Sequence, residues 1–319
     1  MEVKEKNPAW LNESHPNFNR WQQARNLSVE RGKFVRSVIN QKIKTSNLKI
    51  LDLGSGEGGT SNVFSDDNLV VSLDLSLIRL QRQKGILIPK ESTNKNSELI
   101  HSHFDQSEKP VSNIVEDFSV EDSFEMTTIN YPNDLAFVNG NALLLPFANS
   151  SFDLIIIQDV IEHLINTSDF YSEVKRVLRM NGLVYLSTPN KLSVFNFITD
   201  PHFGLPVLSL LKRESIKKYF LKYFRKDDNL RNDIAQLLSL NEIINIFSND
   251  FEITLYTKFS VQELFNGNKG IVWSDFHLKL IAFCKSIKLD KVLIKIANDK
   301  IGIINKYFTP TFYFALKKL

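Results

Sequence analysis

The chain has 319 residues, of which 43% are hydrophobic and 24% charged, an ordinary composition for a globular protein with a sizeable core. Cys284 is its single cysteine, which excludes a disulfide within the chain. The start of the chain lacks the apolar stretch of a signal peptide, and no run approaches the ~18 apolar residues that span a bilayer. We therefore expect a cytoplasmic protein.

The net charge of +3 is unevenly distributed along the chain. Residues 205–319 contain 19 Lys/Arg and 11 Asp/Glu, a charge of +8, whereas the first 204 residues contain 20 basic and 25 acidic residues, a charge of −5. A basic C-terminal third favours anionic partners, including peripheral contact with a membrane surface. The alternative interpretation is a solvated, lysine-rich face.

The first predicted elements are a helix over 27–44 and a strand over 48–53, which a glycine-rich turn ends. A strand at 69–75 follows, and a helix begins near 77. Strand, glycine turn, helix and strand form the βαβ pattern of a parallel sheet. Five further strands are expected, at 136–139, 152–158, 183–187, 251–256 and 311–316.

Two later helices carry end signals. The helix over 167–179 is predicted to stop at Asn181 and Gly182, and Ser239 with Glu242 forms a capping box that opens a helix to about Phe247. Further helical material is expected at Leu205–Tyr223 and Trp273–Tyr307. The whole pattern predicts an α/β fold, a doubly wound Rossmann-like seven-stranded sheet with inserted cap segments.

The most informative motif is Asp52-Leu-Gly54-Ser-Gly56-Glu-Gly58, directly after the first strand. Glycines there allow positive φ and close approach of a ligand, and the next helix offers unpaired N–H groups. A dinucleotide-binding spacing would have to use Gly54, Gly56 and Gly59. Asp52 argues against that oxidoreductase interpretation because it would repel a pyrophosphate, whereas it would tolerate a cationic ligand.

This loop resembles the (D/E)-x-G-x-G-x-G motif of class I S-adenosylmethionine (SAM)-dependent methyltransferases. Asp74, which ends the second strand, resembles the acidic residue that binds the ribose hydroxyls in that class. Gly140-Asn-Ala, Leu145-Pro-Phe and Ser151-Phe-Asp are similar to the G-D-A, L-P-F and S-F-D run of the type-11 group. The resemblance covers roughly residues 48–190 and continues through Glu162-His163.

The resemblance implies SAM as the cofactor. Asn141 stands where the family usually has an aspartate that accepts from the adenine amino group, and its carbonyl can keep that contact. The implied cofactor-binding residues are Asp52, Gly54, Ser55, Gly56, Gly58, Asp74, Leu75, Asn141, Ala142 and Gln158.

Methyl transfer is an in-line displacement, and a hydroxyl acceptor also needs a base. The candidates for catalysis are His163, His202 and Asp159, and no metal is expected. In an alternative interpretation, Asp159 and Glu162 share a helix face and hold a divalent metal with both histidines, similar to small-RNA 2′-O-methyltransferases. Otherwise the Glu-His pair simply opens a helix.

The segments 187–190, 200–206 and 208–213 resemble methyltransferases associated with bacterial cell-surface glycans and lipid-linked sugars. This predicts a small-molecule, sugar or lipid-linked glycan acceptor, methylated at oxygen, and no nucleic acid partner. The alternatives are a metal-assisted RNA 2′-O-methyltransferase and a non-catalytic SAM-binding subunit. The apolar stripe of Trp273–Tyr307 is expected to be core or a homodimer interface.

Four parts of the chain follow from these assignments. Residues 1–45 form an N-terminal helical segment or lid, and 46–190 the SAM-binding core, with a polar insertion at about 86–134. Residues 191–238 are an insertion on the acceptor side, and 239–319 complete the core with a helical insertion.

Overall fold

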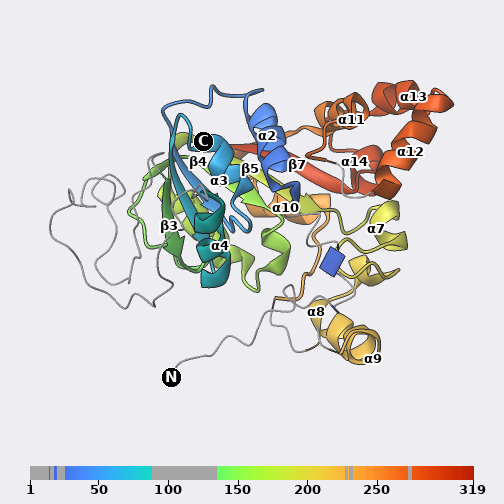
Figure 1. Cartoon of the computed structure of the whole chain (residues 1–319), viewed down its shortest axis with the longest axis horizontal. Helices are drawn as coiled ribbons and strands as arrows, with labels where there is room; N and C mark the ends of the chain where they lie inside the picture. Colours follow the sequence, from blue (N-terminus) through green and yellow to red (C-terminus); the bar gives the residue numbers. More distant parts are fainter. Residues whose placement is uncertain are drawn as a thin grey trace, which may run out of the picture.

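The computed structural model describes residues 14, 18–19, 26–87, 135–226, 229, 233–271 and 275–319 (Figure 1). The predicted polar insertion, from residue 88 to residue 134, lies outside the described residues, and so does most of the segment before residue 26.

One seven-stranded sheet forms the centre of the protein, in the order β3-β2-β1-β4-β5-β7-β6. Only β7 runs antiparallel to its two neighbours, β5 and β6. This topology confirms the predicted doubly wound, Rossmann-like fold. The strands are β1 (Lys49–Leu53), β2 (Leu69–Asp74), β3 (Leu135–Asn139), β4 (Phe152–Gln158), β5 (Leu178–Pro189), β6 (Phe251–Leu255) and β7 (Thr311–Lys318).

Helices cover both faces of the sheet, so the central strands are apolar on both sides. Alternate residues of one strand enter different cores, as Ile50 and Leu51 do in β1. One core receives side chains from α2 (Ser28–Ile39), α3 (Gly59–Phe64) and α4 (Leu77–Leu87). The other core receives side chains from α6 (Thr167–Val177) and α10 (Leu240–Phe247).

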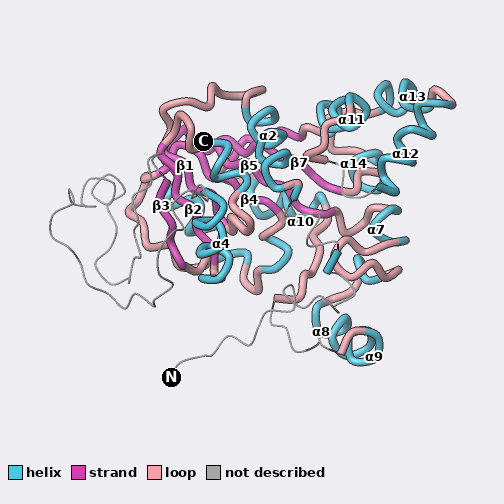
Figure 2. The backbone as a smooth tube through the Cα atoms, in the orientation of Figure 1, coloured by secondary structure: helices cyan, strands magenta, loops and turns pink. Residues whose placement is uncertain are grey.

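Apart from the short η3 (Ile161–His163) between β4 and α6, the other described helices belong to two insertions that project on the right of the view in Figures 1 and 2. The first, between β5 and α10, holds α7 (Val194–Ile198), η4 (Leu208–Leu210), α8 (Arg213–Ser215), the π-helical η5 (Ile216–Leu221) and α9 (Lys222–Phe224). The second, between β6 and β7, holds α11 (Thr257–Asn266), α12 (Asp275–Ser286), α13 (Leu289–Ile296) and α14 (Ile303–Tyr307). None of the helices in the described part of the chain could cross a bilayer.

One predicted helix end is wrong. α6 ends at Val177, and Asn181 and Gly182 lie inside β5 instead of terminating a helix. The register with β4 shifts there, because Phe152 pairs with Leu178 whereas Leu154 pairs with Leu183. The positive φ of 60° at Asn181 therefore belongs to a strand irregularity. By contrast, the predicted capping box of Ser239 and Glu242 is present at α10.

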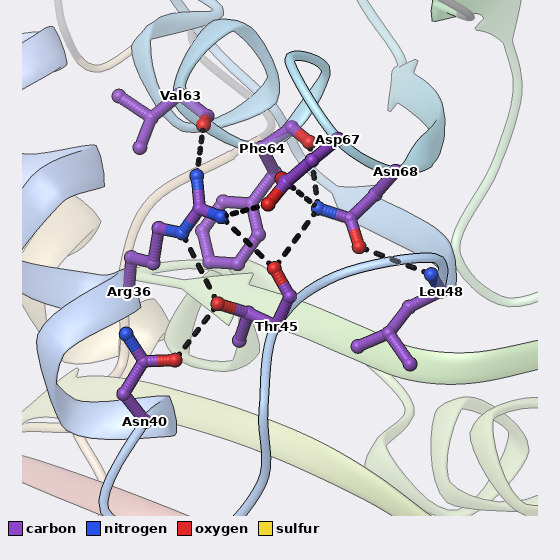
Figure 3. A network of polar contacts seen from close by, with 8 residues as sticks. All are labelled: Arg36, Asn40, Thr45, Leu48, Val63, Phe64, Asp67 and Asn68. Carbon is purple, nitrogen blue, oxygen red and sulfur yellow. Dashed lines mark hydrogen bonds and ion pairs between the residues drawn. The ribbon is translucent and has the colours of Figure 1, made fainter.

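A polar network fastens α2 to the sheet (Figure 3). The Arg36 guanidinium donates to the carbonyls of Val63 (3.0 Å) and Thr45 (2.9 Å) and pairs with Asp67. The Asn68 side chain joins the same carbonyl of Thr45 to the turn before β1. The network satisfies backbone groups at the end of α3 and in the turn before β1, so it fixes how α2 lies on the sheet.

Replacing Arg36 by alanine should lower the free energy of unfolding by about 2 kcal/mol or more, because the carbonyls of Val63 and Thr45 each lose a donor and the ion pair with Asp67 is removed. Urea denaturation of the full chain measures this loss. Lys33→Ala is the matched control, since Lys33 is exposed and pairs only with Glu30 one turn away. Equal midpoints for both variants would contradict the structural role of the network.

Candidate functional site

The glycine turn after β1 is held in a conformation that only glycine adopts readily. Gly54, Gly56 and Gly58 have φ values of 72°, 56° and 76°. A Cβ on Gly54 would lie 2.4 Å from the Val160 side chain, so packing alone requires glycine there. A Cβ on Gly56 would have no neighbour closer than 3.9 Å. The backbone of Gly56 therefore borders open space.

The carboxylate of Asp74, at the end of β2, closes this turn. Gly56 donates its N–H to Asp74 Oδ2 at 2.9 Å, and Ser76 donates its N–H to Oδ1 at 2.8 Å. Each oxygen retains a lone pair for a further donor. β1 and β2 are parallel neighbours, so their carboxyl ends bring the turn and the acid to one edge of the sheet.

Gln83 of α4 supports the turn, although the sequence analysis did not single it out. Its amide donates to Ser55 Oγ at 2.9 Å and to the Gly56 carbonyl at 2.8 Å, and it accepts from Ser72 at 2.7 Å. The predicted ligand residue Ser55 thus contacts Gln83 through its hydroxyl. The sequence did contain an indication of this role, because Gln83 follows the buried Leu80 by one helical turn and so lies on the same face of α4.

Asp52 lies beneath the turn and is 1% exposed. Its carboxylate accepts from the Ser61 hydroxyl at 2.6 Å and from the Ser61 backbone. Burial raises the pKa of Asp52 from 3.8 to about 7, against the lowering effect of these hydrogen bonds. The position places a titratable group directly under the predicted ligand site.

The raised pKa of Asp52 predicts a specific dependence of stability on pH. The folded protein binds this proton more tightly than the unfolded chain does, so the resulting stability is complete below about pH 4 and is lost as the pH rises to about 7. Relative to Asp52→Asn, the free energy of unfolding of the wild type should fall by up to about 1.4 kcal/mol per pH unit in this range. Denaturant titrations of both proteins across it measure the difference. The exposed Asp66→Asn should leave the slope unchanged, and a parallel course for wild type and Asp52→Asn would disprove the shift.

The residues expected on the adenine side lie beside Asp74. Gly140 donates its N–H to the Asp74 carbonyl at 3.2 Å, which brings the turn after β3 to the end of β2. Leu75 is 74% exposed there. Asn141 Oδ1 accepts from the backbone N–H of Leu143 at 3.0 Å and keeps one lone pair. Ala142, which follows Asn141, is partly buried. The apolar side chain of Leu75 and the carbonyl acceptor of Asn141 therefore border the same edge of the sheet.

A small hollow of about 10 Å³ opens at the ends of β4 and β5. Gln158, a predicted cofactor-binding residue, lines it and donates to Thr60 at 2.6 Å. Asp159, a predicted catalytic residue, also lines it and forms an ion pair of 2.9 Å with Arg31 of α2. Asp159 has a φ of 52°, rare for a residue with a side chain. The strained backbone turns its carboxylate toward Arg31.

Three lining residues of this hollow were missed by the sequence analysis: Arg31, Tyr185 and Tyr313. Burial raises the pKa of both tyrosines, so their phenols stay protonated. Arg31 had a signal, since it lies one turn before the buried Phe34 and Val35 of α2. An arginine on the apolar side of a helix points to a buried anionic partner.

The two predicted catalytic histidines lie together elsewhere, with Glu162. His163 ends η3 (Ile161–His163), and its ring lies 5.0 Å from that of His202 in an edge-on arrangement. Glu162 is 1% exposed, accepts from the Thr188 hydroxyl at 3.0 Å, and lies 3.8 Å from His202 Nε2. Burial and then the nearby Asp159 carboxylate raise the pKa of Glu162 well above its usual value.

The arrangement corrects one detail of the metal alternative. Asp159 and Glu162 do not share a helix face, because Asp159 precedes η3 in a left-handed conformation. Of the four residues in that alternative, the structure groups Glu162, His163 and His202. Desolvation raises the pKa of Asp159, against the lowering effect of Arg31, which is its ion-pair partner.

Residues 51–186 match a family model described as a methyltransferase domain. A probable S-adenosylmethionine-dependent methyltransferase of Mycolicibacterium smegmatis is 42% identical over 55 residues, which cover 17% of this chain and 21% of that protein. One from Mycobacterium tuberculosis is 38% identical over 63 residues, covering 20% and 23%. The chain thus matches less than a quarter of the length of these relatives.

Among solved structures, an S-adenosylmethionine-dependent methyltransferase from Mesorhizobium loti has a TM-score of 0.49 and 11% identity, covering 88% of this chain and 96% of that one. Phosphoethanolamine N-methyltransferase 2 of Haemonchus contortus, also with a TM-score of 0.49, is 14% identical and covers 95% and 58%. The family match thus covers residues 51–186, less than half of this chain.

Proposed function

We propose that the chain is a SAM-dependent methyltransferase whose cofactor is held where the glycine turn meets Asp74. The observation that carries this proposal is the 2.9 Å hydrogen bond from the Gly56 N–H to the Asp74 carboxylate. This hydrogen bond joins two features: a turn whose backbone has room for a ligand, and an acid with free lone pairs. Both lie at the carboxyl ends of the strands, where ligands bind in such sheets.

The residues at this edge fit the cofactor. Asp74 would accept from the ribose hydroxyls with its two remaining lone pairs. Leu75 and Asn141 would contact the adenine through an apolar surface and a carbonyl acceptor. The turn at Gly54 and Gly56, with Asp52 beneath it, would receive the amino acid end.

When bound, the cofactor supplies a methyl group activated by a sulfonium. The chain has to align the acceptor, exclude water and take a proton from an oxygen acceptor. His163 and His202 are the groups proposed for this proton, and Asp159 lies at the hollow beside Gln158. The proposed transfer is to oxygen.

We further propose that the acceptor is a sugar, a related small molecule or a lipid-linked glycan. The insertion after β5 supports this, because Arg213 at the start of α8 donates to the carbonyls of Glu162 and Leu164 and so joins the insertion to the histidines. Its outer end exposes aromatic rings and lysines together: Lys218 lies over the ring of Tyr219 at 5.0 Å. Aromatic and basic side chains combined suit an anionic lipid surface.

Alanine at Gly56 should abolish SAM binding measured by calorimetry, because its Cβ would occupy the open space beside the turn. Gly267→Ala is the matched control: it also has positive φ and open space at its Cβ, but it ends α11. Both variants should lose similar stability, about 1–2 kcal/mol. Wild type should bind SAM and S-adenosylhomocysteine but not NAD. If wild type binds neither SAM nor S-adenosylhomocysteine, or if Gly56→Ala binds them normally, the proposed function is wrong.

The proposed lipid contact predicts co-sedimentation with phosphatidylglycerol vesicles, weaker at high salt, and little with phosphatidylcholine vesicles. Serine at Tyr219, Tyr223 and Phe224, which are 56%, 65% and 66% exposed, should reduce this binding at least about tenfold. Serine at the exposed Met180 and Ile165 of the core provides the control. Equal vesicle binding by both sets of variants would contradict a lipid contact. So would a wild type that does not bind vesicles but forms concentration-dependent dimers that the triple variant lacks.

A further inference from the structure

The cluster of Glu162, His163 and His202 has the composition of a metal site. One ligand atom from each residue lies within 4.8 Å of the other two. Two ligands held tetrahedrally about 2.1 Å from a zinc ion are about 3.4 Å apart. Glu162 Oε1 and His202 Nε2, at 3.8 Å, are already close to that spacing. Small side-chain movements would bring all three atoms to one ion.

Glu162 presents a buried oxygen to the cluster. Its Oε2 accepts from Thr188, whereas its Oε1 has no hydrogen-bond partner among the described residues and points toward His202. The side chain is fully buried. A buried polar atom without a partner is costly, and a cation at this position would provide one.

His163 is oriented as a metal-binding histidine commonly is. Its Nδ1 lies 2.7 Å from the carbonyl of Asp233. A carbonyl can only accept, so Nδ1 carries the proton, and Nε2 would be the coordinating nitrogen. Metal-bound histidines characteristically donate their other N–H to a carbonyl or carboxylate in this way.

The backbone around the cluster is fixed by long-range contacts. The Glu162 carbonyl accepts from the Gln236 N–H at 2.8 Å and from Arg213 at 3.2 Å. The turn that presents His202 is capped by Asp200 Oδ1, which accepts the N–H of His202 at 2.8 Å and that of Phe203 at 2.9 Å. The backbone that carries Glu162 and His202 is therefore fixed before any ion binds.

We propose that Glu162, His163 and His202 bind one divalent transition-metal ion of the zinc type. Two imidazoles and one carboxylate suit zinc, cobalt or iron better than magnesium or calcium, which prefer oxygen ligands. Three protein ligands leave at least one coordination position open. A hydroxyl bound there would have a lower pKa, so in the zinc-loaded protein the ion would replace the metal-free histidines as the group that activates the acceptor. This role, unlike the binding itself, rests on the proposed methyl transfer.

The test is calorimetric titration of the full chain with ZnCl₂, after chelator treatment and without an affinity tag, together with visible spectra of the Co²⁺-loaded protein. We expect one bound ion per chain and the absorption bands of low-coordinate cobalt. Glu162→Gln and His202→Ala should each weaken zinc binding at least about tenfold, and Thr188→Val, which only positions Glu162, about tenfold. Glu252→Gln, at an exposed side chain of β6, is the matched control and should bind zinc like the wild type.

A wild type without stoichiometric zinc, or equal zinc binding by wild type and Glu162→Gln, would overturn the site. Glu162→Gln keeps the shape of the side chain and replaces a buried carboxyl by an uncharged amide, so it should remain folded, which circular dichroism checks. SAM titration of the chelated protein separates the two proposals. SAM binding without zinc binding would support the proposed function and exclude the metal site. Zinc binding without SAM binding would support the metal site and exclude the proposed function.

Discussion

The hydrogen bond between the Gly56 backbone and the Asp74 carboxylate determines the shape of the ligand edge. The turn before it can keep its positive φ values only if its N–H groups are satisfied, and Leu73 accepts from both Gly54 and Ser55. Asp74 therefore has two roles. One lone pair of each carboxylate oxygen accepts a backbone N–H of the turn region, and the other remains for a further donor. The edge is preorganised by the fold, so a ligand that binds there does not have to order the loop.

β5 separates two polar regions because its successive side chains point to opposite faces. Ser187 lines the hollow that contains the Arg31–Asp159 ion pair, and Thr188 donates to Glu162 in the histidine cluster. The two regions are still electrostatically connected, since the Asp159 carboxylate contributes to the raised pKa of Glu162. A charge bound on one side of the strand would therefore alter protonation on the other side.

The two insertions differ from the core in their surface. Large exposed hydrophobic side chains in the described residues occur mainly at residues 194–308, including those of α7, α9 and α13, whereas the sheet core exposes few. Both insertions project on the same side in Figure 1. Their basic residues account for the positive charge of the C-terminal third. The core thus provides the proposed ligand edge, and the insertions expose most of the large hydrophobic side chains of the described residues.

The sequence alone determined the strands, the parallel βαβ pattern, the glycine turn and the placement of Asp74, because each depends on a local pattern or on the rule that parallel strands end at one edge. The order of the strands and the antiparallel direction of β7 came only from the structure. It misread Asn181 and Gly182, because a turn signal has the same composition in a helix stop and in a strand irregularity, and only pairing with β4 distinguishes them. Only the tertiary structure decided that Arg31 pairs with Asp159, 128 residues away, and that His202 approaches Glu162. These contacts depend on how the insertions and α2 pack against the edge of the sheet, and no periodicity within one segment contains that information.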